Sequence, residues 1–532
     1  MTASSLAPAK PPPDERPTNV RWLVIGLVTA MSVLLYLDRF AITPVTDTML
    51  RELSLTKEQF GTAVGAFFLA YALMQIPSGW LTDTLGGRWT LAAYVVCWSA
   101  ATIALGFAHG LAAIWGVRLV LGIAQAGAYP AAAALLKRWV PPASRGLANS
   151  SAAMGGRCGL LLALIITVPC MLLAGRVLGW PTGAWRVVFG VYGSLGLIWA
   201  VAFVSLFRNS PAEHSWCNAA EVRLIEGKPQ PTASLGVGAI CVLLFAANIA
   251  WIVLIANLPT SSLTALTRRL SAQLGNEFVA SLIVRAVPEL IGLCGTLILC
   301  VLAAGLLRLS SPADSRRLGL PLVPMLASKE VWIMCFNQFF VNIGWVFLAT
   351  WLPQYLIENH GAYLTAKIGN EKIVAALITA VVQLAAIAGG LSGGRATDVF
   401  VRRFGRAWGR RLPGMCSGVI ACGLYLLVSQ VSGLWPFAAV MILIAFTIDF
   451  GLGASWASYQ DIGGRHVASV LGVGNMCGNL GAAIFARGIG YLADNDKWHY
   501  VFWISAAAMS LVSCCWLLFD ASRPVVREDA AP

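Results

Sequence analysis

The chain has 532 residues, of which 58% are hydrophobic and only 11% are charged. Soluble domains usually carry about a quarter of charged residues, so this composition excludes an ordinary soluble protein and indicates an integral membrane protein. The formal net charge of +13 does not indicate a nucleic-acid partner. Most lysines and arginines lie in short loops between apolar runs, where basic residues mark the cytoplasmic side of a membrane protein.

The chain begins with a polar, proline-rich segment, residues 1–21, which we interpret as a disordered cytoplasmic tail rather than a signal peptide. A helix needs about 20 apolar residues to cross a hydrocarbon core of roughly 30 Å. By this rule we predict fourteen spans, at 22–43, 60–81, 90–107, 111–134, 147–173, 186–207, 236–257, 287–309, 330–355, 373–394, 412–430, 434–457, 467–490 and 499–519. An even number of spans returns the second tail, 521–532, to the cytoplasmic side.

A weak internal repeat indicates two related halves. GWLTDTLGGRWT (79–90) comes after the second span, and GGLSGGRATDVFVRRFG (389–405) comes after the tenth; each is a glycine-rich turn that carries an acid followed by arginine. We therefore predict an all-α fold with six-helix bundles at 22–207 and 330–520. The remaining segment, 208–329, would hold an inserted two-helix hairpin and, between its spans, either an amphipathic surface helix or a solvated loop.

These residues resemble a known superfamily. GWLTDTLGGR, at 79–88, resembles the signature loop of major facilitator transporters, and 393–403 is similar to its second-half copy. More narrowly, the chain resembles the anion:cation symporter family, which includes sugar-acid and other organic anion carriers. The segments that carry this resemblance are YLDR (36–39), AYALMQIPSGWL (70–81), RLVLGIAQAGAYPAAAALLKRWVP (118–141), AWRVVFGVYGSLGLIWA (184–200), WLPQYLIENHG (351–361) and WASYQDIGGRHVASVLGVGNMCGNLGAA (456–483).

Ionisable residues within membrane spans are rare and are functional candidates by default. By the predicted spans they are Asp38, Arg39, Arg118, Arg157, Asp449 and Arg487. Arginines outnumber acids, which suits an anionic substrate, and a guanidinium can hold a carboxylate through two hydrogen bonds. We assign Arg39 and Arg118 to the substrate carboxylate, and the resemblance implies the same role. The alternative for Arg39 is a structural pair with Asp38. The alternative for Arg118 is that it does not indicate an anionic substrate, because drug exporters of the same superfamily also have an arginine in the fourth helix.

Cation coupling needs a carboxylate that can be neutralised during the cycle, and Asp38 fits this role. The resemblance implies a second acid at the position of Gln125, which here is an uncharged group of the substrate site. Three options therefore stay open: Asp38 alone, Asp449 as a substitute, or no proton at all, with Na⁺ or exchange instead. Asp449 has an alternative as a structural partner of Arg487 or Arg157.

Neutral polar groups are predicted to complete the site between the halves. The resemblance implies that Tyr71 and Asn475 line the cavity, and placement on the first helix of the second half adds four more candidates: Asn337, Gln338, Asn342 and Trp345. Each has a plain alternative as an interhelical hydrogen bond or packing residue. We assign five loop residues to a cytoplasmic gate: Asp83, Arg88, Asp398, Arg402 and Arg403. The alternative is that they only set the topology of the chain in the membrane.

We therefore predict a secondary active transporter that takes up a small organic anion, a sugar acid or other carboxylate, by alternating access, with H⁺ as the expected co-transported ion. No P-loop motif is present, and we predict no enzyme activity, cofactor, metal site or nucleic-acid partner. A monomer in a bacterial inner membrane is expected. The rival interpretations are a fourteen-span proton-driven drug exporter and a non-transporting membrane sensor.

Overall fold

The computed structural model describes residues 16–179, 183–225, 322–368, 371–494 and 497–525, with the isolated Arg269 and Ala272. All regular secondary structure in these residues is helical. The first half of the chain contains α1 Val20–Phe40, α2 Thr46–Glu52, α3 Lys57–Leu73, α4 Gln75–Leu85, α5 Gly87–Leu105, α6 Leu111–Ala126, α7 Ala128–Trp139, α8 Arg145–Leu178, α9 Ala184–Leu206 and α10 Ala219–Ile225.

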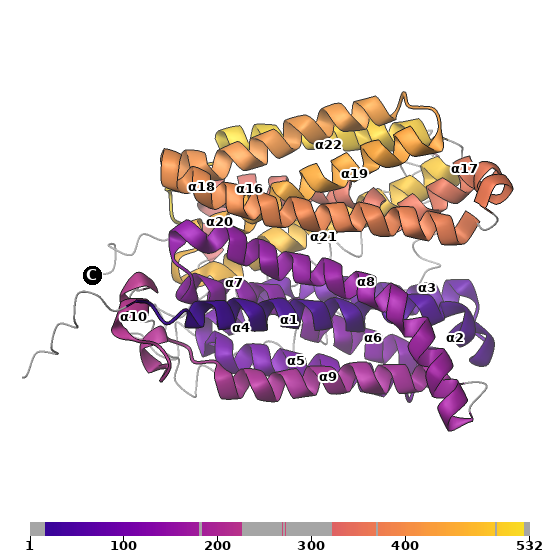
Figure 1. Cartoon of the computed structure of the whole chain (residues 1–532), viewed down its shortest axis with the longest axis horizontal. Coiled ribbons are helices and arrows are strands. Elements are labelled where there is room, and N and C mark those ends of the chain that lie inside the picture. Colours follow the sequence, from indigo (N-terminus) through magenta and orange to yellow (C-terminus); the bar gives the residue numbers. More distant parts are fainter. Residues whose placement is uncertain are drawn as a thin grey trace, which may run out of the picture.

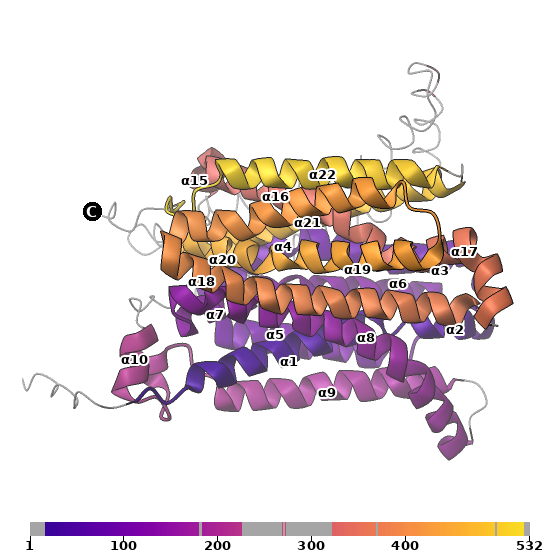
Figure 2. The ribbon, with the colours of Figure 1, turned by 45° about the horizontal axis from the view of Figure 1, so that its top comes forward.

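The second half contains α15 Leu322–Ala327, α16 Lys329–Val346, a π-helical turn η4 Phe347–Trp351, α17 Leu352–Ile368, α18 Glu371–Val428, α19 Leu434–Phe450, α20 Leu452–Ile462, α21 Val467–Asp494 and α22 Trp498–Leu518. Helices of the two halves form two neighbouring layers, indigo to magenta and orange to yellow, in Figure 1 and again in the turned view of Figure 2.

Ten helices of the described residues are long and apolar enough to cross a membrane, and a bent pair, α3 with α4 at 47°, adds an eleventh. Twelve of the fourteen predicted spans overlap these segments, because two predicted spans share α18. The other two, 236–257 and 287–309, lie outside the described residues, as does the amphipathic segment predicted between them. The described residues thus hold ten or eleven membrane-length helices, one of which, α18, covers two predicted spans.

The long α18 folds back on itself. Gly405 has non-helical dihedrals (φ 74°, ψ 176°), and a Cβ built on Gly409 would lie 2.4 Å from the Cα of Val401. Eight residues of straight helix would instead separate these positions by about 12 Å. The arginine-rich segment 401–411 is therefore the turn between the two predicted spans at 373–394 and 412–430.

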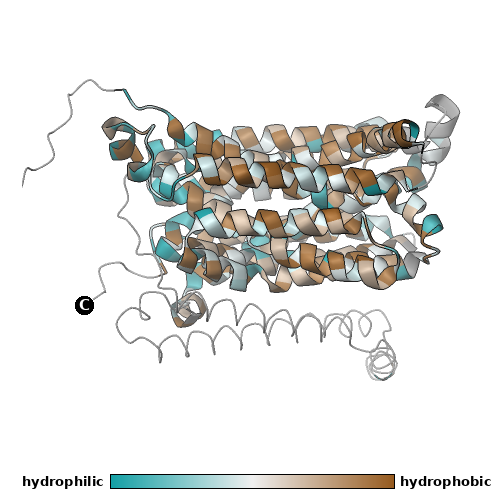
Figure 3. Cartoon of the chain, turned by 90° about the horizontal axis from the view of Figure 1, so that it is seen from below, coloured by the Kyte–Doolittle hydropathy of each residue, from teal (hydrophilic) through white to brown (hydrophobic). Residues whose placement is uncertain are grey.

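Each half packs largely around its own apolar core. Trp98 and Trp139 are fully buried in the first half, and Phe347 and Tyr425 in the second. Many large apolar side chains are also exposed on the outer surface; Val177, for example, is 74% exposed. Hydrophobic residues, brown in Figure 3, occur along most of the helices. A soluble protein rarely exposes so much apolar area, so this surface fits a lipid environment.

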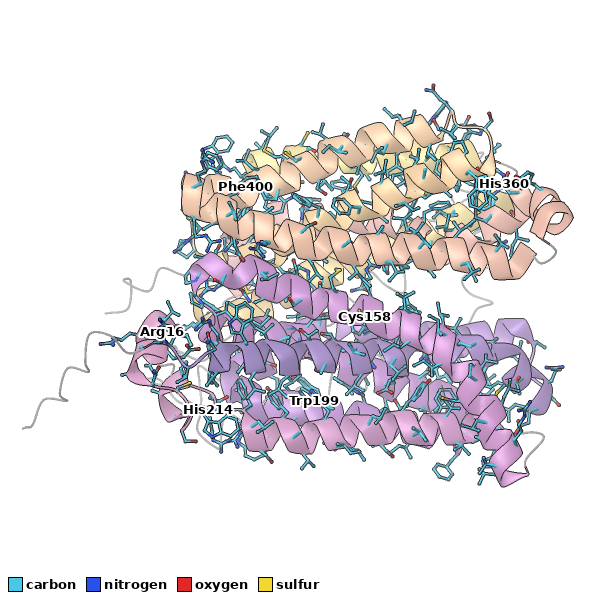
Figure 4. All side chains as sticks on the ribbon, viewed as in Figure 1. Arg16, Cys158, Trp199, His214, His360 and Phe400 are labelled. Atoms are coloured by element: carbon cyan, nitrogen blue, oxygen red, sulfur yellow. The ribbon has the colours of Figure 1, made fainter. Side chains whose placement is uncertain are left out.

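The helices run along one axis, so the body has two ends. The terminal face is the end at which α1 begins and α22 ends; Arg16, His214 and Phe400 lie there in Figure 4. The distal face is the opposite end, where α17 and His360 lie. This division places the predicted gate residues at the terminal face and leaves the predicted anion ligands deeper in the body.

Glycines allow the helices to approach closely. A Cβ on Gly155 of α8 would lie 2.5 Å from the carbonyl oxygen of Thr29 on α1, and one on Gly393 of α18 would lie 2.0 Å from that of Phe450 on α19. Real Cβ atoms do not approach a backbone this closely, so only glycine fits. This geometry gives Gly155 and Gly393 a role in helix packing.

Candidate functional site

A cavity of about 720 Å³ lies between the two halves. Its walls come from α1, α3, α6, α7 and α8 on one side and from α16, α19, α20 and α21 on the other. Thr62 and Thr350, both exposed and both near the distal ends of their helices, contribute to its wall. The cavity is therefore accessible from the distal face.

Arg39 lies on the cavity wall inside a set of aromatic rings. Its guanidinium carbon is 4.8 Å from the ring centre of Tyr36, 4.9 Å from that of Phe67 and 4.3 Å from that of Tyr71. Its Nε donates to Oε1 of Gln125 at 3.0 Å. Among the described residues no protein acceptor contacts the terminal nitrogens of Arg39, so these donors remain available to a bound anion.

Arg118 and Gln125 of α6 stand behind Arg39 rather than on the cavity wall. Arg118 donates from Nη1 to the carbonyl oxygen of Arg39 at 3.2 Å, and its guanidinium lies 4.7 Å from the ring centre of Phe67. Gln125 donates from Nε2 to the carbonyl oxygen of Leu35 at 3.1 Å. Both side chains therefore orient the end of α1 that carries Arg39.

Asp38 does not pair with Arg39. The Asp38 side chain is buried, is absent from the cavity wall, and its two oxygens accept no hydrogen bond of good geometry within the described residues. The Trp98 indole of α5 and Tyr192 of α9 are among its neighbours. Asp38 thus faces the interior of the first half, and the alternative of a structural Asp38 to Arg39 pair is wrong.

Arg157 and Asp449 form an ion pair that joins the halves at the cavity wall. Arg157 of α8 donates from Nη2 to Oδ1 of Asp449 at 2.9 Å and from Nε to Oδ2 at 3.1 Å. Its Nη1 donates to Gln383 at 3.4 Å, and its guanidinium stacks 4.6 Å from the ring centre of Trp345. This pairing is one of the two alternatives considered for Asp449; the side chain of Arg487, the other partner, lies outside the described side chains.

The second half lines the cavity mainly with neutral amides. Gln338, Asn342, Asn475 and Asn479 all contribute to the wall. Asn342 donates to the carbonyl oxygen of Gln338 at 2.8 Å, whereas Asn337 is buried behind the wall, 3.5 Å from the hydroxyl of Ser455. Tyr71 and Trp345 also lie on the wall, whereas two of the predicted neutral site residues, Asn337 and Gln125, lie away from it.

At the terminal face the halves are joined by reciprocal helix caps. Asp83 of α4 accepts hydrogen bonds from the backbone of Ala468 at 3.2 Å and from the backbone and hydroxyl of Ser469 at 2.8 and 2.7 Å, at the start of α21. Asp398 of α18 accepts from the backbone of Gly146 and Leu147 at 2.8 and 2.9 Å, at the start of α8. Each carboxylate neutralises the positive end of a helix in the opposite half.

A buried carboxylate adds a second connection at this face. Asp461 of α20 accepts from Arg410 at 2.9 Å and from Arg145 of the opposite half at 3.2 Å. Beside it, Gln460 and Asn149 exchange amide hydrogen bonds of 2.9 and 3.1 Å across the halves. We call these contacts and the two helix caps the terminal seam; they close the end of the body opposite the cavity mouth.

Comparison with known families identifies the fold. Residues 28–486 match the family model described as Major Facilitator Superfamily, and a second match covers 334–532. The chain belongs to the Major Facilitator Superfamily. Its helices also superpose on a proton:xylose symporter, XylE, with a TM-score of 0.58 and 13% identity, covering 94% of this chain and 95% of that one. At this identity the likeness concerns the fold alone.

Curated relatives of this transporter are named for organic anions. A probable galactarate/D-glucarate transporter of Escherichia coli, GarP, is 24% identical over 96% of this chain and 98% of its own length. A probable sulfoacetate transporter of Cupriavidus necator, SauU, is 33% identical, but that alignment spans 39% of this chain and 46% of the relative. A D-galactonate transporter of Escherichia coli is 31% identical over 36% of this chain and 43% of its own.

The predicted gate residues divide into three groups in this transporter. Asp83 and Asp398 lie in the terminal seam, whereas Arg402 and Arg403 are exposed and make no ion pair within the described residues. Arg88 donates from Nη2 to the carbonyl oxygen of Val204 at 2.5 Å, and both residues belong to the first half. Arg88 therefore links α5 to α9 rather than one half to the other.

The sequence does not mark Arg145, Arg410 or Asp461 as functional, although the seam depends on them. Asp461 lies inside a segment that carries the family resemblance, and Arg410 lies in the arginine-rich turn. Pairing between positions more than 300 residues apart, such as Arg145 with Asp461, has no local signature in a single sequence. The available signal is that Asp461 is an acid in the short loop between the predicted spans 434–457 and 467–490.

Proposed function

We propose that this transporter is a secondary active carrier that takes up a small organic anion, a sugar acid or other carboxylate. The observation that carries the proposal is Arg39, which lies on the cavity wall and whose buried Nη2 has no hydrogen-bond acceptor in the described residues. Burying a cation without hydrogen-bond partners is costly. A carboxylate that enters the cavity would accept two charge-assisted hydrogen bonds from this fork, and Arg118 would hold Arg39 in position.

The names of the relatives support this substrate class, because they are those of sugar-acid transporters. The amides of Gln338, Asn342 and Asn475 offer donors and acceptors suited to hydroxyl groups on the substrate. Tyr71 would contact the carboxylate end, beside Arg39. A hydrophobic drug-like cation, the substrate class of the rival exporter, would instead meet an unpaired positive charge.

We propose that H⁺ is the co-transported ion and that Asp38 carries it. Asp38 is buried without a good hydrogen bond, which favours a neutral carboxyl in this conformation, and it directly precedes Arg39 in the chain. Asp449 is the weaker candidate because two hydrogen bonds from Arg157 already hold it. Na⁺ symport and exchange are the competing outcomes of the pH-gradient test described below.

We propose that transport proceeds by alternating access around this cavity. The terminal seam closes one end, so breaking Asp83, Asp398 and the Asp461 contacts would open it while the distal end closes. In this scheme the terminal face is cytoplasmic, with both termini inside, in a bacterial inner membrane. The fourteen-span plan, two six-helix bundles with an inserted hairpin and a monomeric state, is part of the proposal.

The decisive experiment is an uptake screen in proteoliposomes that contain the purified full chain. Labelled hexonates, hexuronates and dicarboxylates are offered with and without an inward pH gradient. Saturable uptake of at least one of these anions, increased by the gradient, is expected. Efflux of a cationic dye with no anion uptake would support the exporter instead, and anion binding without accumulation would support a sensor.

A further inference from the structure

The cavity wall carries a small and unequal set of charges. Among the described residues that line it, the charged side chains are Arg39, Arg157 and Asp449. Arg157 and Asp449 bind each other through two hydrogen bonds, so their charges cancel. Arg118, the other buried arginine of this region, is not on the wall. The described part of the wall therefore presents one uncompensated positive charge, that of Arg39.

The two wall arginines differ in how many donors they have left. Arg157 uses Nε and Nη2 on Asp449 and Nη1 on Gln383, and its face is covered by Trp345. Arg39 uses only Nε, on a neutral amide. Arg157 thus already holds a carboxylate in the geometry that a substrate carboxylate would adopt at Arg39.

We propose that Asp449 is a specificity-determining residue that fills the second carboxylate position of the cavity, so that the substrate is a polyhydroxylated monocarboxylate and not a dicarboxylate. This inference rests on the proposed function and adds the charge of the substrate to it. The single carboxylate binds at Arg39 in the first half. The uncharged, hydroxyl-bearing end lies against the amides of the second half.

The charge balance explains the expected selectivity. A monoanion neutralises Arg39 and leaves the described wall residues without net charge. A dianion leaves one negative charge uncompensated unless its second carboxylate displaces Asp449 from Arg157, which would expose a buried carboxylate instead. Removing the charge of Asp449 frees Arg157, and the wall then presents two guanidinium groups that match a dianion.

The test is competition in counterflow exchange, with gluconate and glucarate as probes because they share one carbon skeleton and differ in one carboxylate. In the wild type, gluconate should compete at least tenfold more strongly than glucarate. In Asp449→Asn the strength of competition by glucarate relative to gluconate should increase tenfold or more. The double variant Arg157→Gln with Asp449→Asn should return to the preference for gluconate.

A second measurement does not depend on transport by a weakened variant. Glucarate should raise the thermal midpoint of purified Asp449→Asn more than gluconate does, and the reverse should hold for the wild type, since a ligand stabilises the folded state in proportion to its binding. Equal or stronger competition by glucarate in the wild type would overturn the inference while leaving the proposed function intact. A wild type that exchanges no organic anion would overturn the proposed function itself.

Discussion

The two halves meet in two regions that use their charged groups differently. At the terminal seam, Asp83, Asp398 and Asp461 each accept hydrogen bonds from the opposite half. In the cavity, Arg39 keeps terminal donors without a protein acceptor in the described residues. Charged groups that bond within the protein stabilise one arrangement of the halves, whereas a charge with spare donors is available to a guest. The comparison separates residues that hold a conformation from residues that bind substrate.

Changing the cavity arginine should have the largest effect on transport. Arg39→Gln removes two charge-assisted hydrogen bonds to the substrate, worth together about 3 kcal/mol, so uptake efficiency should fall about 100-fold. Arg39→Lys keeps the charge but lacks the planar guanidinium, so its uptake efficiency should fall less. The matched control is Arg223→Gln, at an exposed arginine of α10, which should transport normally. Normal uptake by Arg39→Gln would break the comparison.

Filling a glycine of the seam should change the conformational balance. A Cβ on Gly79 would lie 2.4 Å from the carbonyl oxygen of Ala468, whereas nothing lies within 4 Å of a Cβ on Gly65 at the cavity wall. Overpacking costs about 2 kcal/mol, so Gly79→Ala should shift the ratio of closed to open terminal faces about 30-fold.

Spin-label distances across the terminal face measure this ratio. Gly65→Ala is the matched control, because it adds the same methyl group where space is open, and its distance distribution should equal that of the wild type. If Gly79→Ala leaves the distribution unchanged, the seam does not hold the closed state.

Neutralising the proposed coupling acid should separate exchange from accumulation. With one H⁺ per substrate, a gradient of one pH unit supports about tenfold accumulation. Asp38→Asn should lose this accumulation yet retain exchange, because Asp38 is absent from the cavity wall. Paired uptake and counterflow assays on the same vesicles give both values. Retained gradient-driven accumulation would exclude Asp38 as the proton carrier and return the choice to Asp449 or Na⁺.

Removing one charge from the seam should have the smallest effect. Asparagine is also a good helix cap, so Asp83→Asn loses only the interaction of the charge with the helix dipole, about 1 kcal/mol. The closed-to-open ratio should change about fivefold by the same distance measurement. Asp520→Asn, which removes a charge that hydrogen-bonds locally to Ser522, should leave the ratio unchanged. A fivefold change in both variants would indicate a general charge effect.

Much of the fold could be predicted from the sequence because span detection depends on local composition. Twelve predicted spans overlap long apolar helices, and the motif at 79–88 indicated the superfamily that the family match now shows. Bends were harder to predict. The break at Met74 between α3 and α4 depends on packing against other helices, because an apolar run looks the same whether it is straight or bent. The turn at Gly405, in contrast, lies in the arginine-rich segment between two predicted spans.

The site could be predicted only in part. Arg39 and Tyr71 lie on the cavity wall because polar residues in a span tend to face the bundle interior. The same rule does not say which interior they face, and Asp38 points into the first half rather than the cavity. The Arg157 to Asp449 pair and the Arg145 to Asp461 contact join distant parts of the chain, so a single sequence shows the charges without their partners.

The central claim is that the cavity recognises the negative charge of its substrate through Arg39. Competition between gluconate and the uncharged alditol sorbitol for counterflow exchange tests it most directly, because the two molecules carry similar hydroxyl groups and differ in charge. We predict that gluconate competes and that sorbitol at a 100-fold higher concentration does not. Equal competition by sorbitol would contradict the claim, since the unpaired guanidinium would then contribute nothing to recognition.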